Sequence, residues 1–184
     1  PSPISKATLL IAEYAVPGFA SAMPGSNGTL SGGGNAGGTG RSRPEPVKMS
    51  DKVKGRKVVI FGLPGAYTRT CSAAHVPSFI RTKADFDAGG VDEIICVSVN
   101  DPFVMAAWAK DTGAEDAGLT FLADAGPEFT KAIGMNWTAE PAGFYDRSRR
   151  YALYAEDGVV KVLNVEDGPG ACEISAGETL LAAI

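Results

Sequence analysis

From Lys57 onward, apolar runs with strand character alternate with helical segments, and this alternation limits the folds open to the chain. Strands alternating with helices form a sheet with crossover helices. A two-residue hairpin turn is expected at Asp157-Gly158, which adds an antiparallel edge. The sequence therefore predicts an α/β fold with a mixed central sheet flanked by helices. We expect strands at residues 57–63, 91–100, 119–123, 150–156 and 159–163, and helices at 71–88, 102–112 and 127–133.

Length and composition indicate one globular domain. The chain has 184 residues, of which 45% are hydrophobic, and no run approaches the roughly 18 apolar residues of a membrane span. The net charge of −4 gives no basic field for nucleic acid, although Lys and Arg cluster at 52–57 and 147–150. We therefore expect neither a membrane protein nor a nucleic-acid-binding protein.

The first quarter of the chain differs in composition from the rest. An apolar segment at 7–16 predicts a first strand, whereas residues 18–46 are rich in Gly, Ser, Asn and Pro. Such a stretch buries little surface and has a high backbone entropy. We interpret 1–46 as an N-terminal strand plus a mobile insertion, and 47–184 as the main part of a single domain.

Local signals mark two helices. Pro77 lies inside the helix expected at 71–88 and predicts a kink there. Ser175 and Glu178 have the spacing of a capping box ahead of the apolar C-terminal residues. A short capped helix is therefore expected to end the chain.

The cysteine count indicates a reactive thiol in a reducing compartment. Three cysteines without a CxxC pair, and a single histidine, His75, support neither a disulfide framework nor a metal site. No basic segment followed by a clean apolar core opens the chain, which starts with Pro1. We expect a cytoplasmic protein, with a mitochondrial or plastid location as the alternative for a processed eukaryotic chain.

The segment PGAYTRTC, residues 64–71, joins a predicted strand to a predicted helix. A helix N-terminus carries a partial positive charge that stabilises a thiolate in its first turn, so Cys71 is a candidate nucleophile. Thr68 stands where a dithiol motif would have its other sulfur. A hydroxyl can bind an oxygen species but cannot form a disulfide, so the segment favours attack on oxygen over dithiol exchange.

PGAYTRTC has the PxxxTxxC pattern of peroxiredoxins. Other segments, among them FGLPGAYTRTCSAAHVPSF, VDEIICVSVNDPFVMAAW, EFTKAIGM and RSRRYALYAEDGVVKVLNVE, make residues 47–184 similar to the type 5 (type II) peroxiredoxins. The resemblance implies a thioredoxin-like fold. It also implies a thiol peroxidase that reduces hydrogen peroxide and organic hydroperoxides without metal or haem.

Site roles follow from the resemblance. Cys71 is the expected peroxidatic cysteine, which becomes a sulfenic acid, with Thr68 bonding the sulfur and the peroxide and Pro64 shielding the thiol. Arg150 is the expected cation that stabilises charge on the peroxide oxygens. Its competitors are Arg147 and Arg149, and Arg69 is expected to point outward. Gly65, Ala66 and Tyr67 are expected to line the substrate pocket, with His75 nearby as a structural or tuning residue.

Resolution of the sulfenic acid stays open at the sequence level. Cys172 and Cys96 are the candidate resolving cysteines, although Cys96 also fits a small core residue. Alternatively, a small thiol or glutaredoxin attacks Cys71 directly. The expected reductant is glutathione with glutaredoxin, or thioredoxin.

The resemblance further implies a homodimer. Its apolar contributors would be Phe103, Val104, Trp108 and Phe144, for which core packing is the alternative. Two other functions remain: a redox sensor that passes oxidation to a partner protein, and a thiol-disulfide oxidoreductase, against which Thr68 argues.

Overall fold

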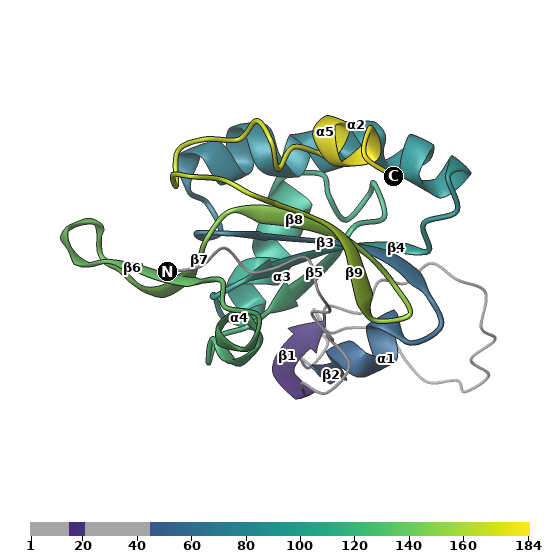
Figure 1. The fold of residues 1–184 in the computed structure, drawn as a ribbon. Helices are drawn as coiled ribbons and strands as arrows, with labels where there is room; N and C mark the ends of the chain where they lie inside the picture. Colours follow the sequence, from purple (N-terminus) through teal and green to yellow (C-terminus); the bar gives the residue numbers. More distant parts are fainter. Residues whose placement is uncertain (1–14, 21–44) are drawn as a thin grey trace, which may run out of the picture.

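The computed structural model describes residues 15–20 and 45–184, and its centre is a seven-stranded mixed sheet (Figure 1). The strand order is β2-β1-β5-β4-β3-β8-β9. The strands are β1 (Ala15–Ala20), β2 (Glu45–Lys48), β3 (Lys57–Leu63), β4 (Glu93–Ser98), β5 (Thr120–Ala123), β8 (Tyr151–Glu156) and β9 (Val159–Val165), with β6 (Asn136–Ala139) and β7 (Phe144–Ser148) in a separate pair. The helices are α1 (Met49–Val53), α2 (Val76–Ala88), α3 (Pro102–Asp111), α4 (Glu128–Ala132) and α5 (Gly177–Leu181), with a π-helical turn η1 (Cys71–His75) and a 3-10 turn η2 (Glu140–Ala142).

The sheet has a parallel centre and antiparallel edges. β3, β4 and β5 pair in parallel, whereas β8 pairs antiparallel with β3, and β9 with β8. Asp157 and Gly158 both have positive φ in the β8–β9 turn, as a type I′ hairpin requires. The predicted mixed sheet, with its antiparallel hairpin, is confirmed.

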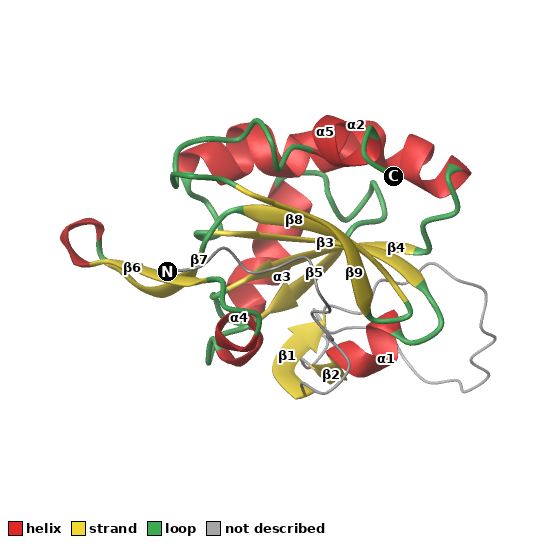
Figure 2. Cartoon of the chain, viewed as in Figure 1, coloured by secondary structure: helices red, strands yellow, loops and turns green. Residues whose placement is uncertain are grey.

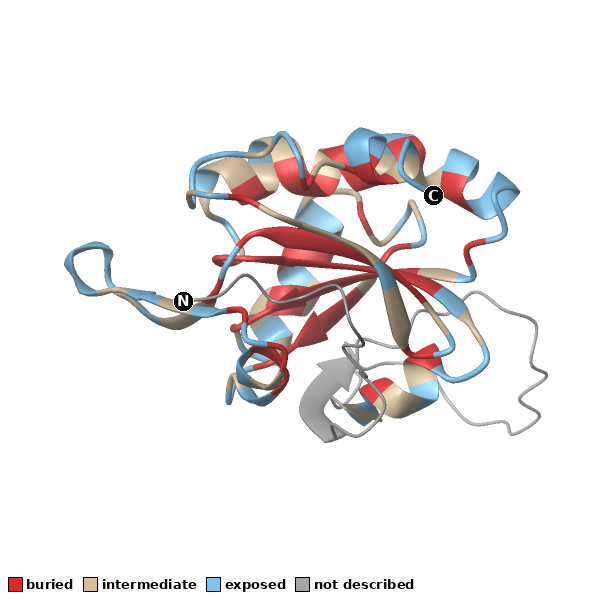
Figure 3. Cartoon of the chain, in the orientation of Figure 1, coloured by how far each residue is buried: buried red, intermediate tan, exposed pale blue. Residues whose placement is uncertain are grey.

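Each face of the sheet has its own apolar core (Figure 3). Alternate residues along a strand point to opposite faces, so β3 supplies Phe61 to one core and Ile60 to the other. α2, α3 and α5 cover the first face, where α2 and α5 lie against each other (Figure 1). α1 and α4 contribute to the second core. The sheet thus lies between two helical layers, and the junction of β3 and α2 is on the face that α2, α3 and α5 cover.

Two features of the N-terminal region differ from the prediction. Of the strand expected at 7–16, residues 7–14 lie outside the described part of the chain, and the observed strand is β1 (Ala15–Ala20). The expected mobile insertion at 18–46 begins and ends in strand, because β1 pairs with β2 (Glu45–Lys48). Residues 21–44 lie outside the described residues.

The β6–β7 pair was not expected from the sequence. These strands form a hairpin that extends away from the main sheet, with η2 at its tip (Figure 2). Gly143 ends η2 with a left-handed φ of 72°. The sequence predicts no strand between residues 134 and 149, so this hairpin is an addition to the expected fold.

The helix after β3 begins earlier than expected and is not uniform. The Ser72 N–H already donates to the Thr68 carbonyl at 3.0 Å, so Cys71 lies in the first turn. η1 is π-helical, with the Val76 N–H donating to the Cys71 carbonyl. Pro77 follows η1 as the second residue of α2 and, because it has no N–H, donates no hydrogen bond to the preceding turn. The chain thus changes its helical pairing just before the proline, and the kink stays a prediction.

The capping box predicted for the last helix is absent. The N-cap residue of α5 is Ala176, without a side-chain cap. The Ser175 hydroxyl donates to Glu166 instead, and the Glu178 carboxylate accepts from Arg81. The Gly177 N–H is satisfied from another helix, by the Ser78 hydroxyl at 2.9 Å. Ser175 and Glu178, the two residues of the predicted capping box, therefore form tertiary hydrogen bonds instead of local ones.

Candidate active site

Cys71 lies in the first helical turn after β3 and is fully buried. Its sulfur is at the N-terminal end of the continuous helix formed by residues 69–88, where free N–H groups create a partial positive charge. The apolar core around Phe61 and Phe79 closes the site from below. The sequence prediction that a thiol stands at a strand-to-helix junction is confirmed by these element bounds.

Arg150 contacts the sulfur with both terminal nitrogens. Nη1 and Nη2 each lie 3.4 Å from Cys71 Sγ, and the side chain is only 2% exposed. Nη2 also donates to the Pro169 carbonyl at 2.9 Å. Arg150 stands just before β8, in its link to β7, so the sheet fixes its backbone. A planar guanidinium held in this way can stabilise negative charge on sulfur and then on a departing oxygen.

The two neighbouring arginines contact other parts of the site. Arg147 Nη1 donates to the Pro64 carbonyl at 3.4 Å, and Arg149 Nη2 donates to the Glu166 carbonyl at 3.3 Å. Among the three candidates, Arg150 alone has a hydrogen bond to the Cys71 sulfur in the described structure.

His75 lies between Arg150 and the backbone. Its Nε2 is 3.0 Å from the Ser175 carbonyl oxygen and its Nδ1 is 3.2 Å from Arg150 Nη1. Burial, together with the Arg150 charge, lowers the pKa of His75 to about 3, so the ring is neutral at neutral pH. A neutral ring fits these distances with a proton on Nε2 and a lone pair on Nδ1. His75 therefore accepts from Arg150, as expected of a tuning residue rather than a base.

The loop between Pro64 and Thr68 is held from several sides. The Ala66 N–H donates to Asn100 Oδ1 at 2.9 Å, and the Thr68 hydroxyl donates to the Gly65 carbonyl at 2.9 Å. A Cβ at Gly65 would lie 2.9 Å from Arg147 Nη1, so a side chain there would disturb this packing. In the described structure, the Thr68 hydroxyl has no hydrogen bond to the sulfur.

Tyr67 is largely exposed. Its side chain is 53% exposed, and its hydroxyl donates to Asp111 Oδ2 on α3 at 2.6 Å. Its φ of 60° is an unfavourable conformation for a tyrosine, so the loop is strained at this position. The expected role of Tyr67 as a pocket residue stays a prediction.

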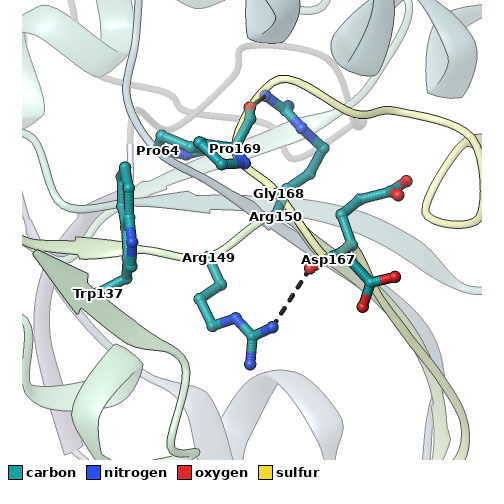
Figure 4. A pocket seen from close by; sticks show the side chains of 8 residues that line it. Pro64, Trp137, Arg149, Arg150, Asp167, Gly168 and Pro169 are labelled. Atoms are coloured by element: carbon teal, nitrogen blue, oxygen red, sulfur yellow. Dashed lines mark hydrogen bonds between the residues drawn. The ribbon is translucent and has the colours of Figure 1, made fainter. Parts of the chain in front are cut away.

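A cavity of about 310 Å³ opens beside the site (Figure 4). Of the predicted site residues, it includes Pro64 and Arg150 and none of Gly65, Ala66 or Tyr67. Trp137 forms one wall and Arg149 another, while Pro64 and Pro169 lie together at one end (Figure 4). Arg149 was considered as a competing cation, and the sequence contained no signal for the other members. The full lining is Pro64, Trp137, Arg149, Arg150, Glu166, Asp167, Gly168 and Pro169.

The other two cysteines occupy different environments. Cys96 is fully buried in β4, which pairs with β3 on one side and β5 on the other. Burial raises the pKa of the Cys96 thiol well above its usual range. Cys172 is half-buried in the loop between β9 and α5, and burial also raises its pKa, although Arg150 partly opposes this. No described cysteine is in a disulfide.

Comparison of the sequence with known proteins identifies the family of this chain. The sequence matches the Redoxin family over residues 24–181. It is 49% identical over 140 residues to Peroxiredoxin-2E-2, chloroplastic, of Oryza sativa subsp. japonica, a match that covers 75% of this chain and 62% of the relative. The chain belongs to the peroxiredoxins of the Redoxin family. Because the match covers 62% of the rice relative, this chain spans less than two thirds of that relative's length.

Two further relatives agree. Peroxiredoxin-2F, mitochondrial, of Arabidopsis thaliana is 45% identical over 143 residues, which cover 78% of this chain and 71% of the relative. The crystal structure of reduced Prx3 in complex with H2O2 from Vibrio vulnificus is 43% identical, with a TM-score of 0.70 over 78% of this chain and 90% of that one. The resemblance of 47–184 to type II peroxiredoxins and the thioredoxin-like fold are thus confirmed.

Proposed function

We propose that this peroxiredoxin reduces hydrogen peroxide and organic hydroperoxides with Cys71 as the nucleophile. The observation that carries the proposal is the double contact of Arg150 with the Cys71 sulfur, at 3.4 Å from each nitrogen, in a fully buried site. A thiolate there attacks the terminal peroxide oxygen, the O–O bond breaks, and the sulfur becomes a sulfenic acid. The leaving oxygen departs as water or an alcohol after taking up a proton.

The cavity beside Pro64 supports this proposal as an approach to the site. Arg150 lines the cavity and also contacts the sulfur, so a hydroperoxide entering there meets the cation that its reduction requires. Trp137 and two prolines give part of the wall an apolar character suited to an organic tail. Thr68, Gly65 and Ala66 keep their expected roles near the peroxide as predictions.

Cys172 is the better candidate for resolving the sulfenic acid. A disulfide needs Cα atoms within about 7 Å, so a resolving cysteine must be able to approach Cys71. Cys96 is fixed in β4 by strands on both sides, whereas Cys172 lies on a loop. We therefore propose a Cys71–Cys172 disulfide, which an external thiol then reduces.

The electron donor, the assembly and the compartment complete the proposal. Peroxiredoxins use no prosthetic group, and we propose glutathione with glutaredoxin, or thioredoxin, as the donor.

A homodimer would use the exposed side of α3, where Phe103 is 59% exposed, whereas Trp108 is buried and belongs to the core. A cytoplasmic location stays a prediction, since the relatives named above are chloroplastic and mitochondrial. No helix in residues 45–184 is long and apolar enough to cross a membrane.

Mass spectrometry after one equivalent of hydrogen peroxide tests the chemistry. The wild-type protein should form a Cys71–Cys172 disulfide, Cys172→Ser should stop at the sulfenic acid, or at a glutathione adduct where glutathione is added, and Cys71→Ser should consume no peroxide. Normal consumption by Cys71→Ser would refute the proposal. A sensor that passes oxidation to a partner would instead form a stable mixed disulfide and turn over slowly with reductant.

A further inference from the structure

Glu166 is a buried carboxylate that the proposed chemistry leaves without a role. It follows β9 directly and is 5% exposed, and it has no ion pair within 4.0 Å among the described residues. A buried carboxylate is costly unless hydrogen bonds satisfy it. Its Oε1 accepts three, from the Glu173 N–H at 2.7 Å, the Ser175 N–H at 2.9 Å and the Ser175 hydroxyl at 2.8 Å. These bonds hold its pKa below the usual range although burial opposes them.

From Glu166, a chain of hydrogen bonds leads to the reactive sulfur. Ser175, which donates twice to the carboxylate, accepts from His75 Nε2 through its own carbonyl at 3.0 Å. The opposite ring nitrogen of His75 is 3.2 Å from Arg150 Nη1, and that nitrogen contacts Cys71 Sγ. Each member fixes the orientation of the next, because the neutral His75 ring has one donor and one acceptor.

The same carboxylate also closes a loop that meets Arg150 from the other side. The bond to the Glu173 N–H brings together the two ends of the segment between residues 166 and 173. Within this segment, the Pro169 carbonyl accepts from Arg150 Nη2 at 2.9 Å. The Glu166 N–H in turn donates to the Arg150 carbonyl at 3.0 Å. Both terminal nitrogens of the guanidinium are therefore held by partners that Glu166 organises.

We propose that Glu166 is a positioning residue for peroxide reduction, which aligns the Arg150 guanidinium on Cys71 through Ser175, His75 and the Pro169 loop. It lines the cavity beside the site, but it has no hydrogen bond to Cys71 or to the Arg150 guanidinium among the described residues, so it acts on them through Ser175, His75 and the loop. Charge stabilisation by a guanidinium depends steeply on its placement, so a small loss of alignment slows the reaction. The inference rests on the proposed function, in which Arg150 acts on a peroxide at Cys71.

Two substitutions in the full chain test the inference. Glu166→Gln keeps the shape but replaces charge-assisted hydrogen bonds, which are about twice as strong as neutral ones. We expect the second-order rate constant with hydrogen peroxide to fall about threefold to tenfold in Glu166→Gln and further in Glu166→Ala. Glu173→Gln is the matched control, because it makes the same chemical change on an exposed side chain of the same loop and keeps the backbone N–H. Its rate should equal that of the wild type.

Alkylation by iodoacetamide separates positioning from a general loss of structure. Alkylation of Cys71, followed by mass spectrometry, depends on charge stabilisation at sulfur but not at a leaving oxygen, so its rate should fall less than the peroxide rate. A parallel change of both rates, or a Glu166→Gln peroxide rate equal to that of Glu173→Gln, would overturn the inference. If Glu166→Ala does not fold by circular dichroism, Glu166→Gln alone decides. A wild-type protein that consumes no peroxide would instead refute the proposed function.

Discussion

A guanidinium that meets a sulfur with two nitrogens can follow charge as it moves during a reaction. Arg150 Nη1 and Nη2 are both 3.4 Å from Cys71 Sγ, so one nitrogen can remain on sulfur while the other turns to a peroxide oxygen. Arg150→Gln should therefore lower kcat/KM for hydrogen peroxide by at least about 100-fold, the usual cost of losing one preorganised donor. Arg150→Lys should recover only part of this rate, because an ammonium lacks the planar fork.

Stopped-flow measurement of hydrogen peroxide consumption checks this prediction. Arg69→Gln is a suitable control, since Arg69 lies in the same motif with an exposed side chain. A rate constant unchanged from the wild type in Arg150→Gln would remove this arginine from the mechanism.

At the scale of elements, the docking of α5 on α2 places Ser175 next to His75. This contact depends on Gly177, where a Cβ would lie 2.7 Å from the Ser78 carbonyl oxygen and 2.6 Å from Thr82 Oγ1. Gly177→Ala should push the helices apart and lower the free energy of unfolding by about 1 to 3 kcal/mol in urea titration, as overpacking does. Gly170→Ala, with nothing within 4 Å of its Cβ, should cost less than about 0.5 kcal/mol. Equal stability of the two variants would refute the close-packing argument.

The same scale shows what sequence can predict. β3 was predicted with its observed bounds, because a strand that is buried after its first residue leaves a continuous apolar run that needs no tertiary knowledge. The hairpin of β6 and β7 was missed, since its half-exposed strands have weak alternation and its turn is a 3-10 segment. The capping box at Ser175 failed for a related reason: Glu166, nine residues away, competes successfully for the hydroxyl.

At the site, too, residues with a local sequence signal were predicted and residues placed by tertiary contacts were not. Cys71, Pro64 and Arg150 were predicted because motif and family resemblance fix their positions, and the structure brings Arg150 to the sulfur. Glu166 and Trp137 could not be found, because their places depend on a loop and a hairpin with no local signal. Residues that act directly are thus easier to read from sequence than those that orient them.

For the whole molecule, His75 links the active site to acid stability. The chain has one histidine, and burial next to Arg150 lowers its pKa to about 3, against about 6.5 in an unfolded chain. Below pH 6.5 the unfolded state binds a proton that the native state does not, so stability present above this pH is lost as pH falls toward 3. Between pH 7 and pH 5 the loss should be about 2 kcal/mol.

Urea titrations at pH 7, 6 and 5 measure this loss, and His75→Gln supplies the comparison. The variant should be less stable at pH 7, because glutamine does not reproduce the bonds to both Ser175 and Arg150, yet its stability should hardly change between pH 7 and pH 6. No other histidine can contribute in this range, and carboxylates titrate below it. A wild-type slope that persists in His75→Gln would show that another group is responsible, and that the buried ring takes up its proton without unfolding the protein.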